Sequence, residues 1–308
     1  MTSAVALSDS EIEPVGKRHT RMPQFSRQKI SWRETGLAAL FLGPSLVVFA
    51  VFFYLPFAKA VRWGNYRTVR AGQAYRYVGL SQYHDVLAGH EFHDGLVHSI
   101  QFVVLTVPTG LILGVLLGVA AHRRLKGIKI FQTIFSSTLA SSVAVSAVVF
   151  YFLINPTVGF FQYNWRNEQG PAMVMAAMPT IWQNLGLAFV IVLAGLQAVP
   201  DEVLEAATLD GYGPVRRLFR ITLPLISPVL LFLFVILTIQ GFQAFAQIEI
   251  VTGGGPAQST ETLVFKIFNL THTNYGQAAV MSVGLFFVTF IVTTVQFLVL
   301  DRRVHYGN

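Results

Sequence analysis

The chain has 308 residues, of which 53% are hydrophobic and 12% are charged. Soluble proteins carry about 25% charged residues, so this composition excludes a globular protein in water and indicates a polytopic membrane protein. The net charge of +7 is better explained by basic residues in cytoplasmic loops than by nucleic-acid binding. The absence of cysteine excludes disulfides, iron–sulfur clusters and thiolate metal sites.

Residues 1–34 are polar and basic, which predicts a cytoplasmic N-terminal tail that is not a cleavable signal peptide. A membrane domain is expected over 35–308. An apolar run of roughly 20 residues crosses the bilayer core, and six segments qualify: about 37–57, 97–121, 130–154, 173–199, 224–248 and 277–300. The predicted fold class is an all-α polytopic membrane protein with six transmembrane helices.

The distribution of lysine and arginine predicts the orientation. Six spans return both termini to one side, and that side receives fifteen of the twenty-two basic residues while the other receives seven. Because basic loops stay in the cytoplasm, we expect both termini and the loop at 200–224 to be cytoplasmic, in a plasma (inner) membrane.

The loops on the opposite side are expected at 58–96, which is long and rich in aromatic residues, and around 252–262. The second begins Thr252-Gly253-Gly254-Gly255-Pro256, which predicts a flexible, turn-rich tip. Within the first, His90-Glu91-Phe92-His93 has its histidines at i and i+3 in an expected loop, whereas a zinc helix needs i and i+4. No metal site is therefore expected.

A short polar interruption at 200–224 separates the fourth and fifth spans. Pro200, followed by Asp201 and Glu202, is a helix-start signal. Gly211 is an end signal, because glycine adopts the left-handed conformation without penalty. Pro214 opens a second helical stretch, so the sequence predicts a helix of about two turns, a turn and a second helix at the membrane surface.

Part of this interruption resembles the conserved loop of the membrane subunits of binding-protein-dependent ABC importers. The resemblance rests on Glu205-Ala206-Ala207, Asp210-Gly211, Phe219, Ile221, Leu223 and Pro224. It implies a coupling helix that docks into an ATPase subunit through Glu205, Ala206, Ala207, Asp210 and Gly211. Glu205 is the expected contact and Asp210 the expected cap of the turn, while Tyr212 stands where the family usually has alanine.

Two further stretches resemble the carbohydrate-type permeases of this family: Ala194-Gly195-Leu196-Gln197 and the glycine-rich run after Thr252. Residues 213–228 and 262–267 are most similar to permeases for glycerol-3-phosphate or its diesters. The resemblance implies a second permease subunit, an ATPase dimer that binds ATP and Mg, and an extracytoplasmic solute-binding protein. The solute is then glycerol-3-phosphate, a glycerophosphodiester or a sugar, carried by alternating access. The chain itself has no GxxxxGK[ST] motif, so we expect neither a cofactor nor an enzyme activity.

Polar side chains within the spans are the candidates for the solute path. Gln240, Gln243 and Gln247 fall at i, i+3 and i+7, which predicts one polar face on the fifth span. Such a face serves either hydrogen bonds between helices or a solute path, and the sequence leaves both open. Trp182, Gln183 and Asn184 in the fourth span suit a hydroxyl-rich ligand or simple packing equally well.

The third span has a surface of small residues between Ser136 and Ser146, which favours close helix packing. The prolines common in this span of the family are absent, so the sequence leaves open whether the span is kinked.

Two other classes of protein remain as alternatives. An ion-coupled secondary transporter usually carries acidic or basic residues within its spans, and here the six expected cores have essentially none. A membrane-embedded enzyme is disfavoured because no catalytic constellation is present.

Overall fold

The computed structural model describes residues 32–69, 74–122, 127–155, 157, 159–160 and 169–300. Most of the expected N-terminal tail, the basic loop at 123–126 and the C-terminal residues lie outside these ranges. The chain divides into two compact units, Met1–Phe53 and Tyr54–Asn308, and each is described by itself.

The first unit contains α1 (Trp32–Phe49), which continues into a π-helical turn, η1 (Ala50–Tyr54). Large apolar side chains on this helix are exposed, among them Phe41 and Phe52. The helix therefore buries almost no apolar surface within its own unit, as expected of a helix whose surroundings are lipid or another protein.

The second unit begins with a helix, a hairpin and a short helix where a loop at 58–96 was expected. These elements are α2 (Leu55–Trp63), β1 (Tyr66–Val69), β2 (Ala74–Tyr77) and α3 (Ser81–Leu87). The two strands are antiparallel, with Tyr66 opposite Tyr77. The Tyr83 hydroxyl of α3 donates to the Val61 carbonyl of α2 at 2.8 Å, and burial raises the pKa of this hydroxyl.

The centre of the second unit is a pair of long helices, α4 (His90–Ala121) and α7 (Gln169–Gln197). Glycines at every fourth position of α4, Gly110, Gly114 and Gly118, face α7. A Cβ built on Gly114 would lie 2.3 Å from the Ala188 Cβ and 3.1 Å from the Ala188 carbonyl carbon. At Gly114 the two backbones are therefore closer than a residue with a side chain would permit.

The third expected span is sharply bent. It consists of α5 (Ile128–Ser136), the 3₁₀ turn η2 (Ser137–Ala140) and α6 (Val143–Ile154), with 103° between the two halves. Ser142 starts α6 as its N-cap, since its Oγ accepts a hydrogen bond from the Val145 N–H at 3.2 Å. The span is thus bent without a proline in this stretch.

The span expected at 224–248 is not one continuous helix in the structure. The chain after Pro200 forms α8 (Asp201–Leu209), α9 (Pro214–Arg217), the π-helical turn η4 (Leu218–Thr222), α10 (Leu223–Leu225), α11 (Ser227–Phe242) and α12 (Ala246–Val251). The helices before and after Ile226 are bent by 72°. A second break follows at Gln243–Phe245, where the Phe245 backbone departs from helical geometry with φ −135° and ψ −65°.

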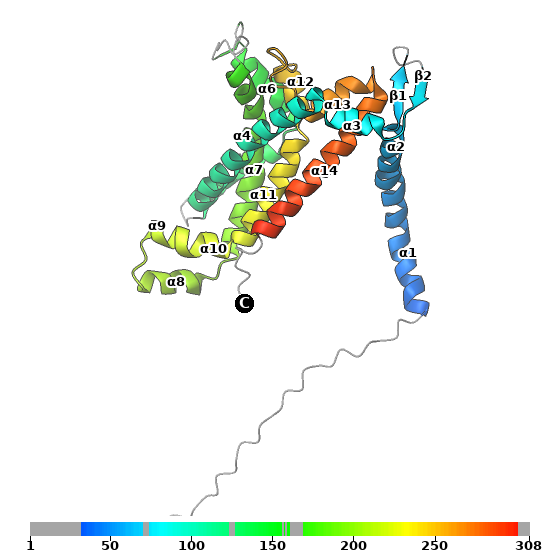
Figure 1. The fold of residues 1–308 in the computed structure, drawn as a ribbon. Helices are drawn as coiled ribbons and strands as arrows, with labels where there is room; N and C mark the ends of the chain where they lie inside the picture. Colours follow the sequence, from blue (N-terminus) through cyan, green and yellow to red (C-terminus); the bar gives the residue numbers. More distant parts are fainter. Residues whose placement is uncertain are drawn as a thin grey trace, which may run out of the picture. The chain divides into compact units, whose positions relative to one another are not determined.

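The chain ends with α13 (Leu263–Thr271) and α14 (Tyr275–Leu300). Figure 1 shows α8, α9 and α10 at one end of this unit, and α12, α13 and the β-hairpin at the other. Four helices in the described residues are long and apolar enough to cross a membrane, and up to six spans result if each bent pair counts as one. The protein is thus an α-helical membrane protein.

The loop between α12 and α13, expected to be a flexible tip, is held by hydrogen bonds. The Thr260 Oγ1 donates to the Gly255 carbonyl at 3.0 Å and lies 2.8 Å from the Thr252 Oγ1. The Thr260 and Thr262 side chains are both fully buried. The glycine-rich run therefore forms a packed turn.

The seam between α4 and α7 generates the first prediction. A valine at Gly114 has no room beside the Ala188 backbone, so Gly114→Val should destabilise the chain by about 1–3 kcal/mol. Gly43→Val is the matched control, because Gly43 is also a helix glycine but has nothing within 4 Å of a built Cβ. The midpoint of thermal unfolding in detergent measures the difference, and equal midpoints for the two variants would contradict the close contact.

Candidate functional site

The first candidate site is the surface loop, which we define as residues 200–224. Its first helix, α8, ends as the sequence predicts: Gly211 adopts the left-handed conformation with φ +77°. The Tyr212 N–H donates to the Ala207 carbonyl at 3.0 Å, and the Gly211 N–H donates to the Thr208 carbonyl at 3.1 Å. These two bonds form a Schellman motif, which satisfies the last carbonyls of the helix and fixes its end.

The side chains of α8 divide into a buried and an exposed set. Glu205 and Ala206 are exposed, as are Asp210 and Gly211 beyond the helix end. Ala207 differs from the expectation that it faces a partner, because it is buried within this chain. The small alanine at this position lets α8 pack closely on its own loop. Leu209, with 89% of its surface exposed, is an apolar side chain that this chain leaves uncovered.

Two contacts brace α8 against the second helical stretch. The Arg217 Nη1 donates to the Thr208 Oγ1 at 2.9 Å. The Arg216 guanidinium lies over the Tyr212 ring, 4.7 Å from its centroid, in a cation–π contact. Tyr212, which departs from the alanine expected here, therefore supports the turn. The two contacts join α8 and its turn to the second helical stretch.

The second candidate site is a partly open cavity of about 510 Å³ in the second unit. We call it the central cavity. It is lined by residues of η2, α6, α7, α11, α12 and the break between the last two: Leu139, Val143, Thr180, Gln183, Asn184, Leu187, Gln240, Gln243, Ala244, Phe245, Ala246 and Gln247. No lining residue is charged, so the polar groups that it offers are amides and one threonine hydroxyl.

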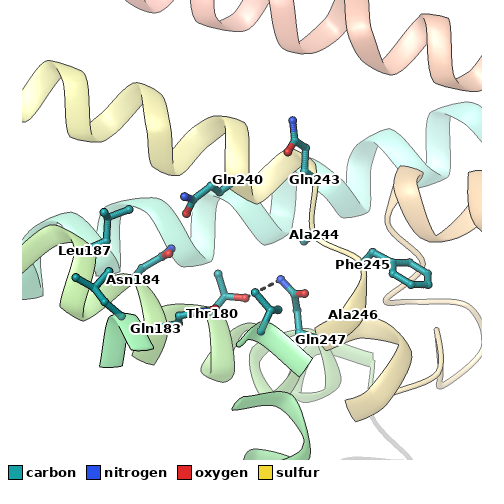
Figure 2. Close-up of a pocket in the computed structure, with 12 residues that line it drawn as sticks. Thr180, Gln183, Asn184, Leu187, Gln240, Gln243, Ala244, Phe245, Ala246 and Gln247 are labelled. Carbon is teal, nitrogen blue, oxygen red and sulfur yellow. Dashed lines mark hydrogen bonds between the residues drawn. The ribbon is translucent and has the colours of Figure 1, made fainter. Parts of the chain in front are cut away.

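The three glutamines all line this cavity, but the prediction that they form one face of a single helix is wrong. Gln240 lies on α11, Gln243 caps the end of that helix, and Gln247 lies on α12. They therefore do not share one face of a continuous helix. The break at Gln243–Phe245 places them on different segments around the cavity, as Figure 2 shows.

Two of the five amides are already engaged in hydrogen bonds between segments. The Gln247 Nε2 donates to the Thr180 Oγ1 at 2.8 Å (Figure 2). The Gln183 Nε2 donates to the Ser141 carbonyl at 2.8 Å, at the bend of the third span. For these two side chains the structure favours a role in holding helices together.

The other amides are free to bind a ligand. Within the part of the chain that the structure describes, the side chains of Gln240 and Gln243 have no hydrogen-bond partner and are exposed to the cavity. Asn184 is only 5% exposed, and its Nδ2 has no protein partner in the described residues. A buried amide without a partner is costly, so the Asn184 Nδ2 is an unsatisfied donor beside the cavity.

Trp182 does not line the cavity. On α7, Thr180, Gln183, Asn184 and Leu187 follow the spacing of one helix face, and Trp182 lies off that face. Its indole packs near the Phe150 ring, with 6.1 Å between the ring centroids. Sequence reasoning missed Thr180, Leu187 and Phe245 as lining residues. The spacing of Thr180 and Leu187 relative to Asn184 was an available signal, but nothing local marked Phe245.

No metal site is present in the described residues, in which no group of three or more His, Asp or Glu side chains comes together. His90 and His93 lie in the first turn of α4 and not in a loop as expected. Glu91, between them, accepts a hydrogen bond from the Gln277 Nε2 at 2.7 Å and so connects α4 to α14.

The chain matches one protein family over most of its length. Residues 91–306 match the family described as "Binding-protein-dependent transport system inner membrane component". Among curated proteins, it is 33% identical to the sn-glycerol-3-phosphate transport system permease protein UgpA of Agrobacterium fabrum, over 88% of this chain and 97% of that protein. It is 34% identical to UgpA of Yersinia enterocolitica, over 88% of this chain and 96% of that protein.

Solved structures agree in fold. The chain is similar to a bacterial alginate ABC transporter solved in complex with an alginate pentasaccharide-bound periplasmic protein, with a TM-score of 0.71 and 19% identity, covering 88% of this chain and 94% of that one. A second structure, of a bacterial ABC transporter involved in the import of alginate, gives a TM-score of 0.69 at 17% identity, covering 88% and 96%.

Proposed function

Since the chain belongs to the family of binding-protein-dependent transport system inner membrane components, we propose that its central cavity is part of the solute path and its surface loop is the coupling element. The chain is a permease subunit of an importer that depends on a solute-binding protein. In this proposal a second permease subunit completes the path, and an ATPase dimer that binds ATP and Mg drives it. The alternative, an ion-coupled secondary transporter, has two observations against it: the expected spans have essentially no charged residues, and the chain belongs to a family of binding-protein-dependent transport components.

The observation that carries the solute path is the set of unpaired amides at the central cavity. Gln240, Gln243 and Asn184 offer donors and acceptors without any charge. Such groups suit the hydroxyls of a polyol or sugar, which hydrogen-bond in several directions. We propose glycerol-3-phosphate, a glycerophosphodiester or a sugar as the solute, with its hydroxyl-bearing part at these amides.

The proposed mechanism is alternating access. ATP closes the ATPase dimer, the surface loop moves with it, and the bent fifth span carries that motion to the central cavity. The exposed Glu205, Ala206 and Leu209 supply the contact surface, while Gly211 and the brace between Arg217 and Thr208 keep α8 rigid. Orientation follows from the basic residues: the surface loop faces the cytoplasm, and the hairpin and α13 face the solute-binding protein.

Orientation is tested with single cysteines in this cysteine-free chain. Leu80 and Leu209 are 75% and 89% exposed and lie on opposite sides in the proposal. Leu80→Cys should react with a membrane-impermeant maleimide in intact cells, and Leu209→Cys only after permeabilisation. The reverse pattern would overturn the orientation.

The coupling element is tested at Gly211. A side chain there opposes the positive φ by about 1–2 kcal/mol and opens the Schellman turn, so Gly211→Val should detach or uncouple the ATPase. Gly213→Val is the control, because Gly213 has φ −65° and ψ 161°, which any residue adopts, and has nothing within 4 Å of a built Cβ.

Co-purification of the ATPase and solute uptake measure the effect in membranes where both variants are inserted. Glu205→Ala should weaken docking without altering the turn. If Gly211→Val and Glu205→Ala both retain the ATPase and transport normally, the surface loop is not the coupling element.

The solute path is tested by comparing two glutamines. Gln240→Leu removes an unpaired amide from the central cavity and should lower uptake several-fold while the complex still assembles. Gln296→Leu is the control, since the Gln296 Nε2 donates to the Thr238 Oγ1 at 2.9 Å away from the cavity. It should lower the free energy of unfolding by about 1 kcal/mol, the contribution of one hydrogen bond, which a small fall in the thermal midpoint of the complex would report, and it should leave the solute concentration for half-maximal uptake unchanged. Normal uptake by Gln240→Leu would remove Gln240 from the path.

A further inference from the structure

The break between α11 and α12 needs something to hold it, because no proline causes it. The Gln243 N–H donates to the Ile239 and Gln240 carbonyls, which closes α11. The Glu249 N–H donates to the Phe245 carbonyl, so the hydrogen-bond ladder of α12 begins after Ala244. The Ala244 carbonyl is thus left outside both helices, in the middle of the unwound segment that lines the central cavity.

A single side chain reaches this carbonyl from a distant part of the sequence. The Thr262 Oγ1 donates to the Ala244 carbonyl at 3.0 Å. The Thr262 side chain is 0% exposed, so water does not compete for the bond. A buried carbonyl with no other partner gains more from such a bond than an exposed one would.

Thr262 is itself attached to the rigid part of the molecule. The next residue, Leu263, is the first of α13, and its N–H donates to the Ser99 Oγ of α4 at 2.9 Å. The Ser99 hydroxyl donates in turn to the Gly95 carbonyl of the same helix at 2.8 Å. The position of Thr262 is therefore fixed relative to α4, the helix whose glycines also pack against α7.

From these contacts we infer that Thr262 is a positioning residue: its hydroxyl holds the unwound segment at Ala244 so that the amides on either side face the central cavity. The inference rests on the proposed role of that cavity in the solute path. Packing alone does not fix the segment in this way. The Phe245 ring lies against the rings of Phe265 and Phe268, at centroid distances of 6.3 and 4.6 Å, and tilted ring contacts set proximity but not the direction of a carbonyl.

The test uses a cysteine at Ala244, whose side chain is 3% exposed, in the assembled complex. N-ethylmaleimide is the probe, and the modified fraction of this otherwise cysteine-free chain is followed by mass. Thr262→Val keeps the shape and removes the hydroxyl, so the segment should open more often and labelling should accelerate roughly two- to tenfold, the range that one buried hydrogen bond supports. Thr262→Ser restores the hydroxyl and should label at the original rate.

Thr106→Val is the matched control. Thr106 is also 0% exposed, but its hydroxyl donates to the Phe102 carbonyl of its own helix at 2.8 Å. A general loss of stability would accelerate labelling in Thr106→Val as well, whereas a positioning role predicts acceleration in Thr262→Val alone. Equal labelling rates for Thr262→Val and Thr262→Ser would overturn the inference.

The labelling rate does not depend on the solute, so it separates this inference from the proposed function. Accelerated labelling in Thr262→Val together with normal uptake by Gln240→Leu would support the positioning role and reject Gln240 as part of the path. Unchanged labelling in Thr262→Val together with reduced uptake by Gln240→Leu would reject the positioning role and support Gln240 as part of the path.

Discussion

Glycine at every fourth position of α4 lets its backbone lie directly against α7, and the central cavity depends on that contact. The Asn184 Cβ lies 3.4 Å from a Cβ built on Gly110, so the amide that marks the cavity sits at one end of the seam. Nearer the N-terminus of α4, Gly95 and Ser99 meet the start of α13. One helix therefore sets the position of the fourth span and of the loop that reaches the fifth. In a bilayer, where apolar surface gains nothing from leaving lipid, this close van der Waals contact takes the place of the hydrophobic core of a soluble protein.

Features with local causes were predictable from the sequence. The end of α8 is an example: Gly211 supplies the positive φ, Pro214 starts the next helix, and both signals lie within a few residues of the turn that they make. The apolar lengths of the spans are equally local. The seam on α4 was also visible, as glycines spaced by four, but a spacing of small residues indicates close packing without naming the partner helix.

Two of the breaks could not be predicted, because each carries a hydrogen bond from a residue elsewhere in the sequence, whereas the bend at Ile226 has prolines on both sides, Pro224 and Pro228. Gln183 of α7 binds the Ser141 carbonyl at the bend of the third span, and Thr262 binds the Ala244 carbonyl at the break of the fifth. From the sequence alone, the fifth span shows no break at Gln243–Phe245 and the third is undecided between straight and kinked. Carbonyls exposed by a break are expensive at membrane depth, so a break persists only where the tertiary fold brings a donor to it. The prediction of one polar face through Gln240, Gln243 and Gln247 failed for this reason, because helical periodicity does not apply across a break in the helix.

The same principle separates the amides of the central cavity into two kinds. Gln183 and Gln247 donate hydrogen bonds that join segments. Removing either amide would leave its acceptor unpaired, which costs stability. Gln240, Gln243 and Asn184 line the cavity without protein partners for their amide N–H groups in the described residues, so that hydrogen-bonding capacity is not used within the chain. The sequence alone does not distinguish the roles of these five residues, because an amide within a span can either bond to another helix or bind a solute. The hydrogen bonds in the structure distinguish them: they assign Gln183 and Gln247 to contacts between segments, and they leave the solute path as our proposal for the other three.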